Sequence, residues 1–190
     1  GNDLKEVGDC IEKAHKIIDN ADDAIDITSS KIELRLIEAL KFYRDGDLSN
    51  ARRIAKEIID HDATEVQKLR AKFYFAMSLD LDDFDARKKK HLEVINEAKK
   101  LKIQDNLKLT EKIEVWKVLS EVFNNTGFVF LKHCDNINKS KNGNPKVLES
   151  LVQEAIGFFN RAIKINKKPE VNDQKGIAIA QVRSSTLSRI

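Results

Sequence analysis

Proline and glycine are scarce in this chain of 190 residues, which contains only two prolines and seven glycines. All-β folds need turn-forming residues far more often, so this scarcity favours long helices. No apolar run approaches the roughly 20 residues that a membrane-spanning helix needs. We therefore expect an all-α protein without a membrane span.

Cysteine is also rare, because the chain has only Cys10 and Cys134 and no Cys-x-x-Cys spacing. Two distant cysteines are typical of reduced thiols in a cytosolic protein or of small buried side chains, and their role stays open. We expect a cytoplasmic protein. Because the chain opens with Gly1 and not with Met, an exported form with a trimmed leader remains an alternative.

The net charge of +3 is too small to indicate nucleic-acid binding by itself. The charge is uneven, however, because residues 101–190 contain 15 Lys and Arg but only 9 Asp and Glu. Such an excess could steer an acidic partner to this half, and an ordinary solvated surface would show it too. A nucleic-acid-associated or regulatory role of the basic C-terminal half is our alternative hypothesis.

The clearest structural signal is a helical hairpin at residues 31–60. Two segments there carry apolar residues at helical spacing, separated by a short polar stretch. Gly46 can adopt the positive φ that a helix exit needs, and Asp47 or Ser49 can cap the next helix. The pattern predicts two antiparallel helices joined by a tight turn.

The same periodicity extends along the chain and predicts about eight helices in one domain, residues 1–190. Thr64 and Gln67 fit a capping box, and Pro145 suits the first turn of a helix. Residues 128–144 fit either an extension of the preceding helix or an inserted loop. The expected hairpins span residues 31–60, 64–102 and 107–166, with flanking helices at 3–20 and 171–187.

Two stretches resemble the tetratricopeptide repeat family. The first-helix signature of that family is matched in spacing by Trp116, Leu119, Ser120, Phe123 and Gly127. Residues 154–169 look like its second helix, with Ala155, Phe159 and Ala162 at the packing positions and Pro169 after the helix. The chain between Gly127 and Ala155 exceeds the ~34-residue unit, which requires an insertion or a lengthened first helix.

The resemblance implies a right-handed array of helical hairpins that binds a peptide or protein on its concave face. It also implies that Trp116 is largely buried between helices. The ligand-facing positions of the matching first helix fall on Glu114, Lys117, Glu121, Asn124 and Asn125. We expect these five residues to line the groove.

Residues with reactive side chains form no convincing catalytic pattern. Adjacent residues on a helix point in different directions, so His133, Cys134 and Asp135 cannot form a dyad with one another. The histidines lack metal-ligand spacing, and the basic run at residues 87–90 is expected to mark exposed helix faces.

The sequence thus predicts a non-catalytic protein–protein interaction or scaffold module without cofactor or metal. It indicates neither the identity of the partner nor the oligomeric state.

Overall fold

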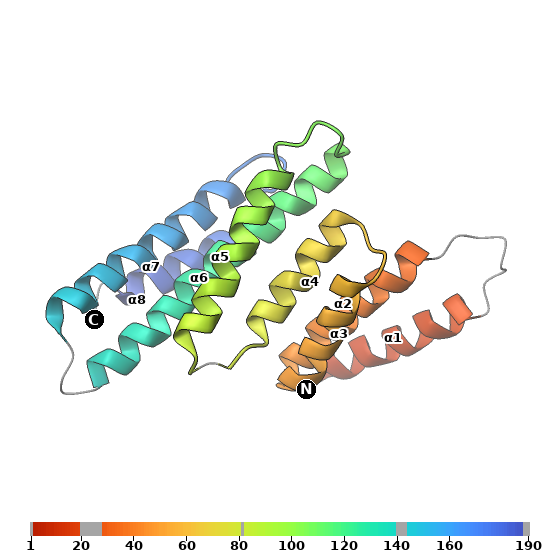
Figure 1. The fold of residues 1–190 in the computed structure, drawn as a ribbon, viewed down its shortest axis with the longest axis horizontal. Coiled ribbons are helices and arrows are strands. Elements are labelled where there is room, and N and C mark those ends of the chain that lie inside the picture. The colour runs from red at the N-terminus through yellow and green to blue at the C-terminus, as the bar shows by residue number, and fades with distance from the viewer. Residues whose placement is uncertain (1, 20–27, 81, 140–143, 188–190) are drawn as a thin grey trace. The chain divides into compact units, whose positions relative to one another are not determined.

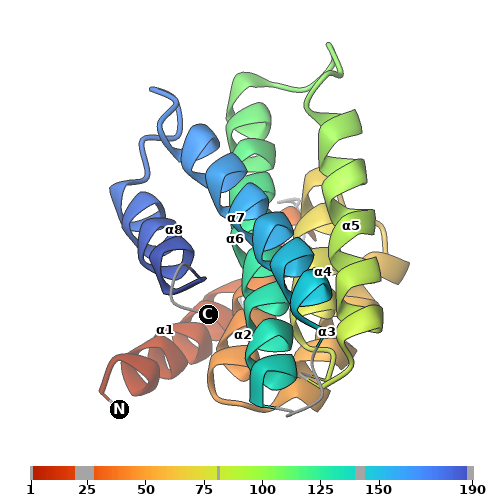
Figure 2. The ribbon, with the colours of Figure 1, turned by 90° about the vertical axis from the view of Figure 1, so that its left-hand side faces the viewer.

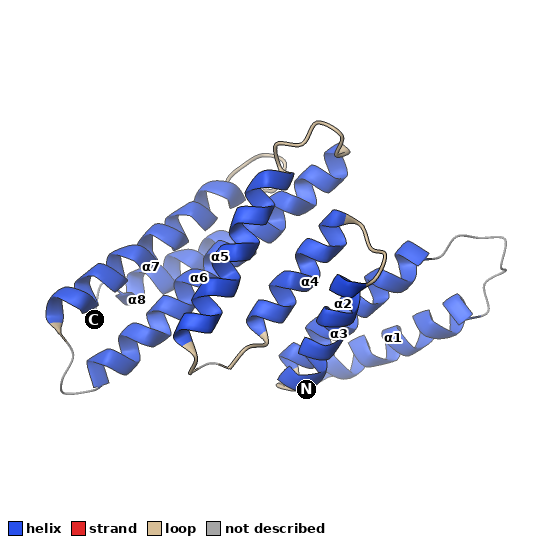
Figure 3. Cartoon of the chain, viewed as in Figure 1, coloured by secondary structure: helices blue, strands red, loops and turns tan. Residues whose placement is uncertain are grey.

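The computed structural model describes residues 2–19, 28–80, 82–139 and 144–187. Eight α-helices occur in this described part of the chain. Figure 3 shows helices and loops there, and no strand. The all-α prediction is therefore confirmed. None of these helices is both long enough and apolar enough to cross a membrane. Residues 1, 20–27, 81, 140–143 and 188–190, which include the whole stretch between the first two helices, lie outside the described residues.

The chain divides into two compact units, residues 1–79 and residues 80–190, called unit 1 and unit 2 below. The boundary falls inside the segment 64–102 that the sequence predicts as one hairpin. The pairing of its two helices, and the single repeat domain, therefore stay predictions. Unit 1 has 13 Lys and Arg against 16 Asp and Glu, whereas unit 2 has 21 against 15.

Unit 1 contains four helices, and each contacts the next along the chain (Figure 1). In addition, the second helix contacts the fourth, so the core lies among the last three helices. Leu36, Ala55 and Leu69, one from each of these helices, are fully buried there. The helices are α1 (Asn2–Asp19), α2 (Thr28–Arg44), α3 (Leu48–Asp60) and α4 (Glu65–Met77).

Local capping residues explain where these helices begin and end. Gly46 has φ 84° in the α2–α3 turn, where only glycine is free of strain. Asp47 caps α3 by accepting a hydrogen bond of 3.1 Å from the N–H of Asn50. Thr64 and Gln67 form a reciprocal capping box at the start of α4. Two helices in contact, α2 and α3, therefore occur where the sequence predicts a hairpin at residues 31–60.

Unit 2 is organised around α6, which contacts α5, α7 and α8 (Figures 1 and 2). With 31 residues, α6 is the longest helix in the described part of the chain. It continues through Gly127 to Lys139, so residues 128–139 extend the helix, while residues 140–143 lie outside the described part. The four helices are α5 (Phe84–Leu101), α6 (Leu109–Lys139), α7 (Pro145–Asn166) and α8 (Gln174–Leu187).

The seam between α6 and α7 is close because a glycine on α6 faces a buried ring on α7. A Cβ added to Gly127 would lie only 2.7 Å from a ring carbon of Phe159, whose side chain is fully buried. Ser120 also donates a hydrogen bond of 2.5 Å to the side chain of Asn166 across this seam. These contacts pair the helices of the predicted hairpin at residues 107–166.

Candidate functional site

The five predicted groove residues all lie on one side of α6. At 100° per residue they fall on the stripe of this helix that is exposed or half-buried, opposite the buried face. The structure therefore brings them together on a single surface, here called the α6 stripe: Glu114, Lys117, Glu121, Asn124 and Asn125.

Contacts within the protein already engage several members of the α6 stripe. Lys117 forms an ion pair of 3.1 Å with Glu114, and the side-chain amide of Asn125 donates to the carbonyl of Glu121 at 2.9 Å. Arg183 of α8 donates a hydrogen bond of 3.2 Å to Asn124. The Asn124 side chain thus helps to hold α8 on α6, which sequence reasoning did not foresee.

A second surface of α6 carries three aromatic residues at seven-residue intervals: Trp116, Phe123 and Phe130. Because two helical turns take 7.2 residues, side chains seven apart lie nearly on one line along the helix. Phe123 and Phe130 are buried, whereas Trp116 keeps a minor part of its surface exposed. This agrees with the expectation that Trp116 is largely buried.

The buried end of this line is an aromatic cluster that joins three helices. The Phe130 ring lies 5.2 Å from Phe84 of α5 and 5.4 Å from Phe158 of α7, measured between ring centroids. His133 stacks on Phe84 at 3.9 Å. Phe130 therefore contacts aromatic rings of both α5 and α7.

A cationic side chain lies over each of the three rings. These side chains belong to α5, to α7 or to the residues just after these two helices. The amines of Lys102 and Lys168 lie 4.7 and 4.4 Å from the centroid of the Trp116 ring. The Arg161 guanidinium lies 5.9 Å from the Phe123 ring, and the Lys88 amine lies 5.0 Å from the Phe130 ring. These three rings and four cations are called the cation–aromatic row below.

The four cations of the row contact no carboxylate among the described residues. Arginines of unit 1 differ, because Arg35, Arg53 and Arg70 each form an ion pair with a glutamate. Glu149 and Glu154 of α7 help to line an open groove of about 680 Å³, which Arg161 also lines. Unit 2 therefore presents positive charge that the fold does not neutralise.

The sequence interpretation missed this row for an identifiable reason. It assigned the basic run 87–90 to exposed helix faces, yet Arg87 is buried and Lys88 is half-buried over two rings. That expectation is wrong for these two residues. The seven-residue spacing of Trp116, Phe123 and Phe130 was a usable signal, although it does not show where cations from other helices lie.

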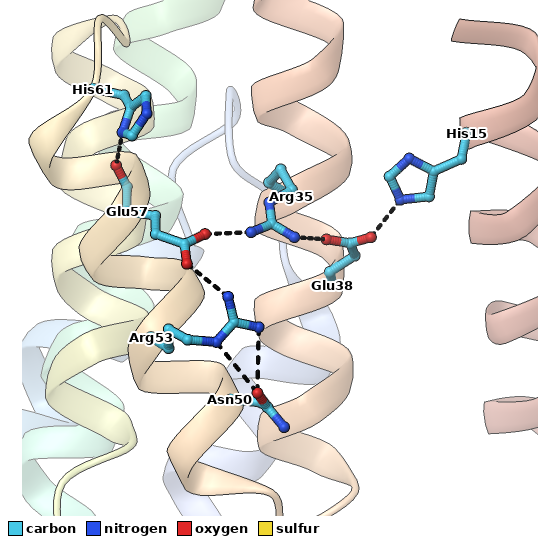
Figure 4. Close-up of polar contacts among 7 residues, drawn as sticks. All are labelled: His15, Arg35, Glu38, Asn50, Arg53, Glu57 and His61. Carbon is cyan, nitrogen blue, oxygen red and sulfur yellow. Dashed lines mark hydrogen bonds and ion pairs between the residues drawn. The ribbon is translucent and has the colours of Figure 1, made fainter. Parts of the chain in front are cut away.

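Unit 1 holds a polar network that links α1, α2 and α3 (Figure 4). His15 of α1 contacts Glu38 of α2, which also accepts a hydrogen bond of 2.8 Å from Arg35. Arg35 reaches Glu57 of α3, which in turn pairs with Arg53 at 2.6 Å. His15 and Glu38 resemble part of a catalytic dyad, but in the described residues no hydrogen bond or ion pair joins them to a nucleophile, so the network is a structural bridge.

The network makes unit 1 sensitive to acid at Glu57. Burial raises the pKa of this carboxyl, but the hydrogen bonds from Arg53 and Arg35 outweigh it, and the net pKa lies below the usual value. A lowered pKa stabilises the fold above the usual glutamate pKa, and this stability is lost as the pH falls through the lowered value. We expect Glu57→Gln to weaken unit 1 at pH 7 by less than about 1 kcal/mol, because Glu57 is partly exposed.

The same variant should lose less stability than the wild type when the pH is lowered through the glutamate range. Urea denaturation at neutral and at acidic pH, followed by circular dichroism, measures this difference. Equal acid sensitivity of the two proteins would contradict the assignment of this stability to Glu57. Lys56→Gln, at an exposed neighbouring position on α3, is the matched control.

Unit 1 also has an apolar groove between α1 and α2, with a volume of about 550 Å³. Its lining includes Val7, Cys10, Leu34 and Ile37, and the only charged residue there is Glu6. Of the described α1 side chains only Ile11 is buried, so this helix is the least embedded element of unit 1.

The residues that sequence analysis considered for catalysis do not form a reactive site. Burial, and then the charge of Asp135, raise the pKa of Cys134 to about 11, so its thiol stays protonated at neutral pH. Burial lowers the pKa of His91 to about 4, so this imidazole is neutral. No group of three or more His, Cys, Asp or Glu side chains is arranged for a metal in the described residues.

Comparison with known proteins gives no relative: no protein-family model, no curated protein and no solved structure matches this chain. The resemblance to tetratricopeptide repeats is thus not supported by a match, and no repeat is identified. The established architecture is all-α, with consecutive helices in contact within each unit.

Proposed function

We propose that this protein is a non-catalytic interaction module that binds an acidic segment of a protein partner along the cation–aromatic row. The supporting observation is that four cations of unit 2 contact aromatic rings but no carboxylate in the described part. The right-handed, tetratricopeptide-like stack with a concave binding face remains part of the proposal, on the strength of the sequence resemblance alone.

The free energies of the two kinds of contact favour an acidic ligand on these cations. An exposed cation–aromatic contact contributes about 0.5–1 kcal/mol, whereas a hydrogen bond to a charged group contributes about 1.5–3 kcal/mol. A carboxylate can therefore draw Lys102, Lys168 or Lys88 into a stronger contact at little cost. The α6 stripe is a weaker candidate, because Lys117 already pairs with Glu114 and Asn124 already accepts from Arg183.

An acidic protein fits the row better than a nucleic acid does. Single-stranded nucleic acids bind by stacking bases on exposed rings, but Phe123 and Phe130 are buried and only Trp116 is partly open. Glu149 and Glu154 in the adjoining groove would also repel phosphates. A peptide can place neutral or basic side chains opposite these two glutamates.

The test measures binding of a fluorescein-labelled glutamate-rich peptide to the full chain by anisotropy. We expect Lys102→Glu with Lys168→Glu to weaken binding by more than about tenfold, which corresponds to 1.4 kcal/mol. Binding should also weaken as the salt concentration rises. Fluorescence of Trp116, the only tryptophan, gives a second readout because both lysines lie at its ring.

The matched control is Lys108→Glu with Lys175→Glu, which changes the charge of unit 2 equally at two exposed positions. We expect this pair to have a small effect. Equal losses in both variants would show that net charge, and not the row, attracts the peptide. Lys117→Glu with Asn124→Ala tests the α6 stripe, and a larger loss there would favour the stripe over the row. Tighter binding of an oligonucleotide than of the peptide, lost in the row variant, would establish the nucleic-acid alternative.

A further inference from the structure

The spacing of the cation–aromatic row restricts the shape of the segment that binds there. The rings of Trp116, Phe123 and Phe130 are seven residues apart on one helix, so their attachment points are roughly 10.5 Å apart along its axis. Each cation lies within 5.9 Å of the ring that it covers. The row therefore offers positive charge at three levels over roughly 21 Å.

An extended strand, a polyproline helix and an α-helix differ in the distance at which side chains recur on one face. Only some of these distances match the spacing of the row. In an extended strand, side chains on one face recur about every 6.6 Å, so neither one nor two such intervals equals 10.5 Å. A polyproline helix repeats about every 9.3 Å, and its mismatch grows along the row. An α-helix repeats its face every seven residues, or about 10.5 Å, so it stays in register at all three levels.

We propose that the segment bound by the row is an acidic α-helix that carries carboxylates at seven-residue intervals. This inference rests on the proposed function and specifies its partner. The helix would lie along α6, and each of its three carboxylates would meet one level of positive charge. Arg161 can hold a carboxylate with two parallel hydrogen bonds, and the two lysines at Trp116 make that level the most strongly cationic.

The cations of the row are more exposed than the Phe123 and Phe130 rings that they cover. In the described residues the backbones of α5 and α7 each approach α6 closely but do not approach each other closely. Lys88, Lys102 and Lys168 are half-buried and Arg161 is exposed, so solvent reaches the charged side of the row. The buried Phe123 and Phe130 rings act as supports that hold the cations in place.

The test compares three peptides of about 21 residues, long enough for three heptads, with the same composition and three glutamates each. In the first the glutamates are seven residues apart. In the second they are five apart, which spreads them around a helix, and in the third they are two apart, as on one face of a strand. We expect the first peptide to bind the full chain about tenfold more tightly than either isomer.

The outcomes separate this inference from the proposed function. Equal affinity of the three isomers would overturn the helical register but leave the binding of acidic segments intact. Tightest binding of the third peptide would establish an extended ligand and would also overturn it. Failure of all three peptides, together with failure of the glutamate-rich probe, would overturn both proposals.

A charge exchange tests the register directly. We expect Lys88→Glu to weaken binding of the first peptide, and a peptide with lysine in place of one terminal glutamate to restore it. Lys89→Glu, at the exposed neighbouring position, is the matched control and should change binding little. Unchanged melting temperatures exclude misfolding, and Lys88→Gln provides a milder variant if Lys88→Glu is unstable. If neither peptide with a terminal lysine restored binding to Lys88→Glu, the proposed register would be contradicted.

Discussion

Replacing Phe130 by alanine is expected to lower the free energy of unfolding of unit 2 by about 4 kcal/mol, within the range measured for buried phenylalanines. The side chain is fully buried, so the substitution removes its transfer free energy and leaves a cavity. It also removes ring contacts to Phe84 on α5 and to Phe158 on α7. Such aromatic pairs contribute about 0.5–1.5 kcal/mol beyond burial.

Chemical denaturation of the full chain, followed by Trp116 fluorescence, measures this loss in unit 2. Trp116→Ala, followed by circular dichroism, is the informative comparison because Trp116 belongs to the same line on α6 but is half-buried. We expect it to cost only about 1–2 kcal/mol, less than burial of the whole ring would imply. A cost below about 1 kcal/mol for Phe130→Ala would contradict its role as the anchor of three helices.

Features that depend on nearby residues could be predicted from the sequence. The turn and the helix start within residues 31–60 could be predicted because Gly46 and Asp47 act within a few residues of one another. The capping box of Thr64 and the helix start at Pro145 are correct for the same reason. In each case one local hydrogen bond or backbone preference decides where a helix begins or ends.

Features that depend on the packing of distant helices could not be predicted in this way. Buried residues cover more than half of the circumference of α6, so periodicity alone does not show which neighbour meets which side. Lys88 was expected on an outer face, yet it lies half-buried over two rings. Its position is decided by where α5 crosses α6, which no local pattern records.

The candidate site illustrates the same limit. The α6 stripe could be found from one helix alone, because its five residues share one face of α6. The cation–aromatic row combines rings from α6 with cations from two other elements, so only the folded arrangement brings it together. Arg183 contacts Asn124 from α8 for the same reason.

Gly127 is the position where a local interpretation and the packing disagree most. Asn-Asn-Thr-Gly is a turn-like sequence, yet the helix continues through it. The glycine is retained in the helix because Phe159 of α7 occupies the space that a side chain would need. Its helical conformation requires no positive φ, so the requirement for glycine here is one of close approach.

Gly127→Ala is therefore expected to destabilise unit 2 by about 2 kcal/mol, although alanine is the better helix former by about 1 kcal/mol. The new Cβ would lie 2.7 to 2.9 Å from three ring carbons of Phe159, which is fully buried. Gly157→Ala is the matched control, because nothing lies within 4 Å of a Cβ there. The same substitution at Gly157 should stabilise the protein, so the two variants should shift the denaturation midpoint in opposite directions.

A second-site change identifies the clash as the cause. In a Phe159→Leu background the ring is absent, so Gly127→Ala should cost little further stability, and the two substitutions should couple by about 1–3 kcal/mol. Denaturation of the two single variants and the double variant measures this coupling. Additive losses would mean that Phe159 is not what excludes a side chain at Gly127. In that case the close α6–α7 seam, which supports Phe158 and Arg161 on the α7 side of the cation–aromatic row, would need another explanation.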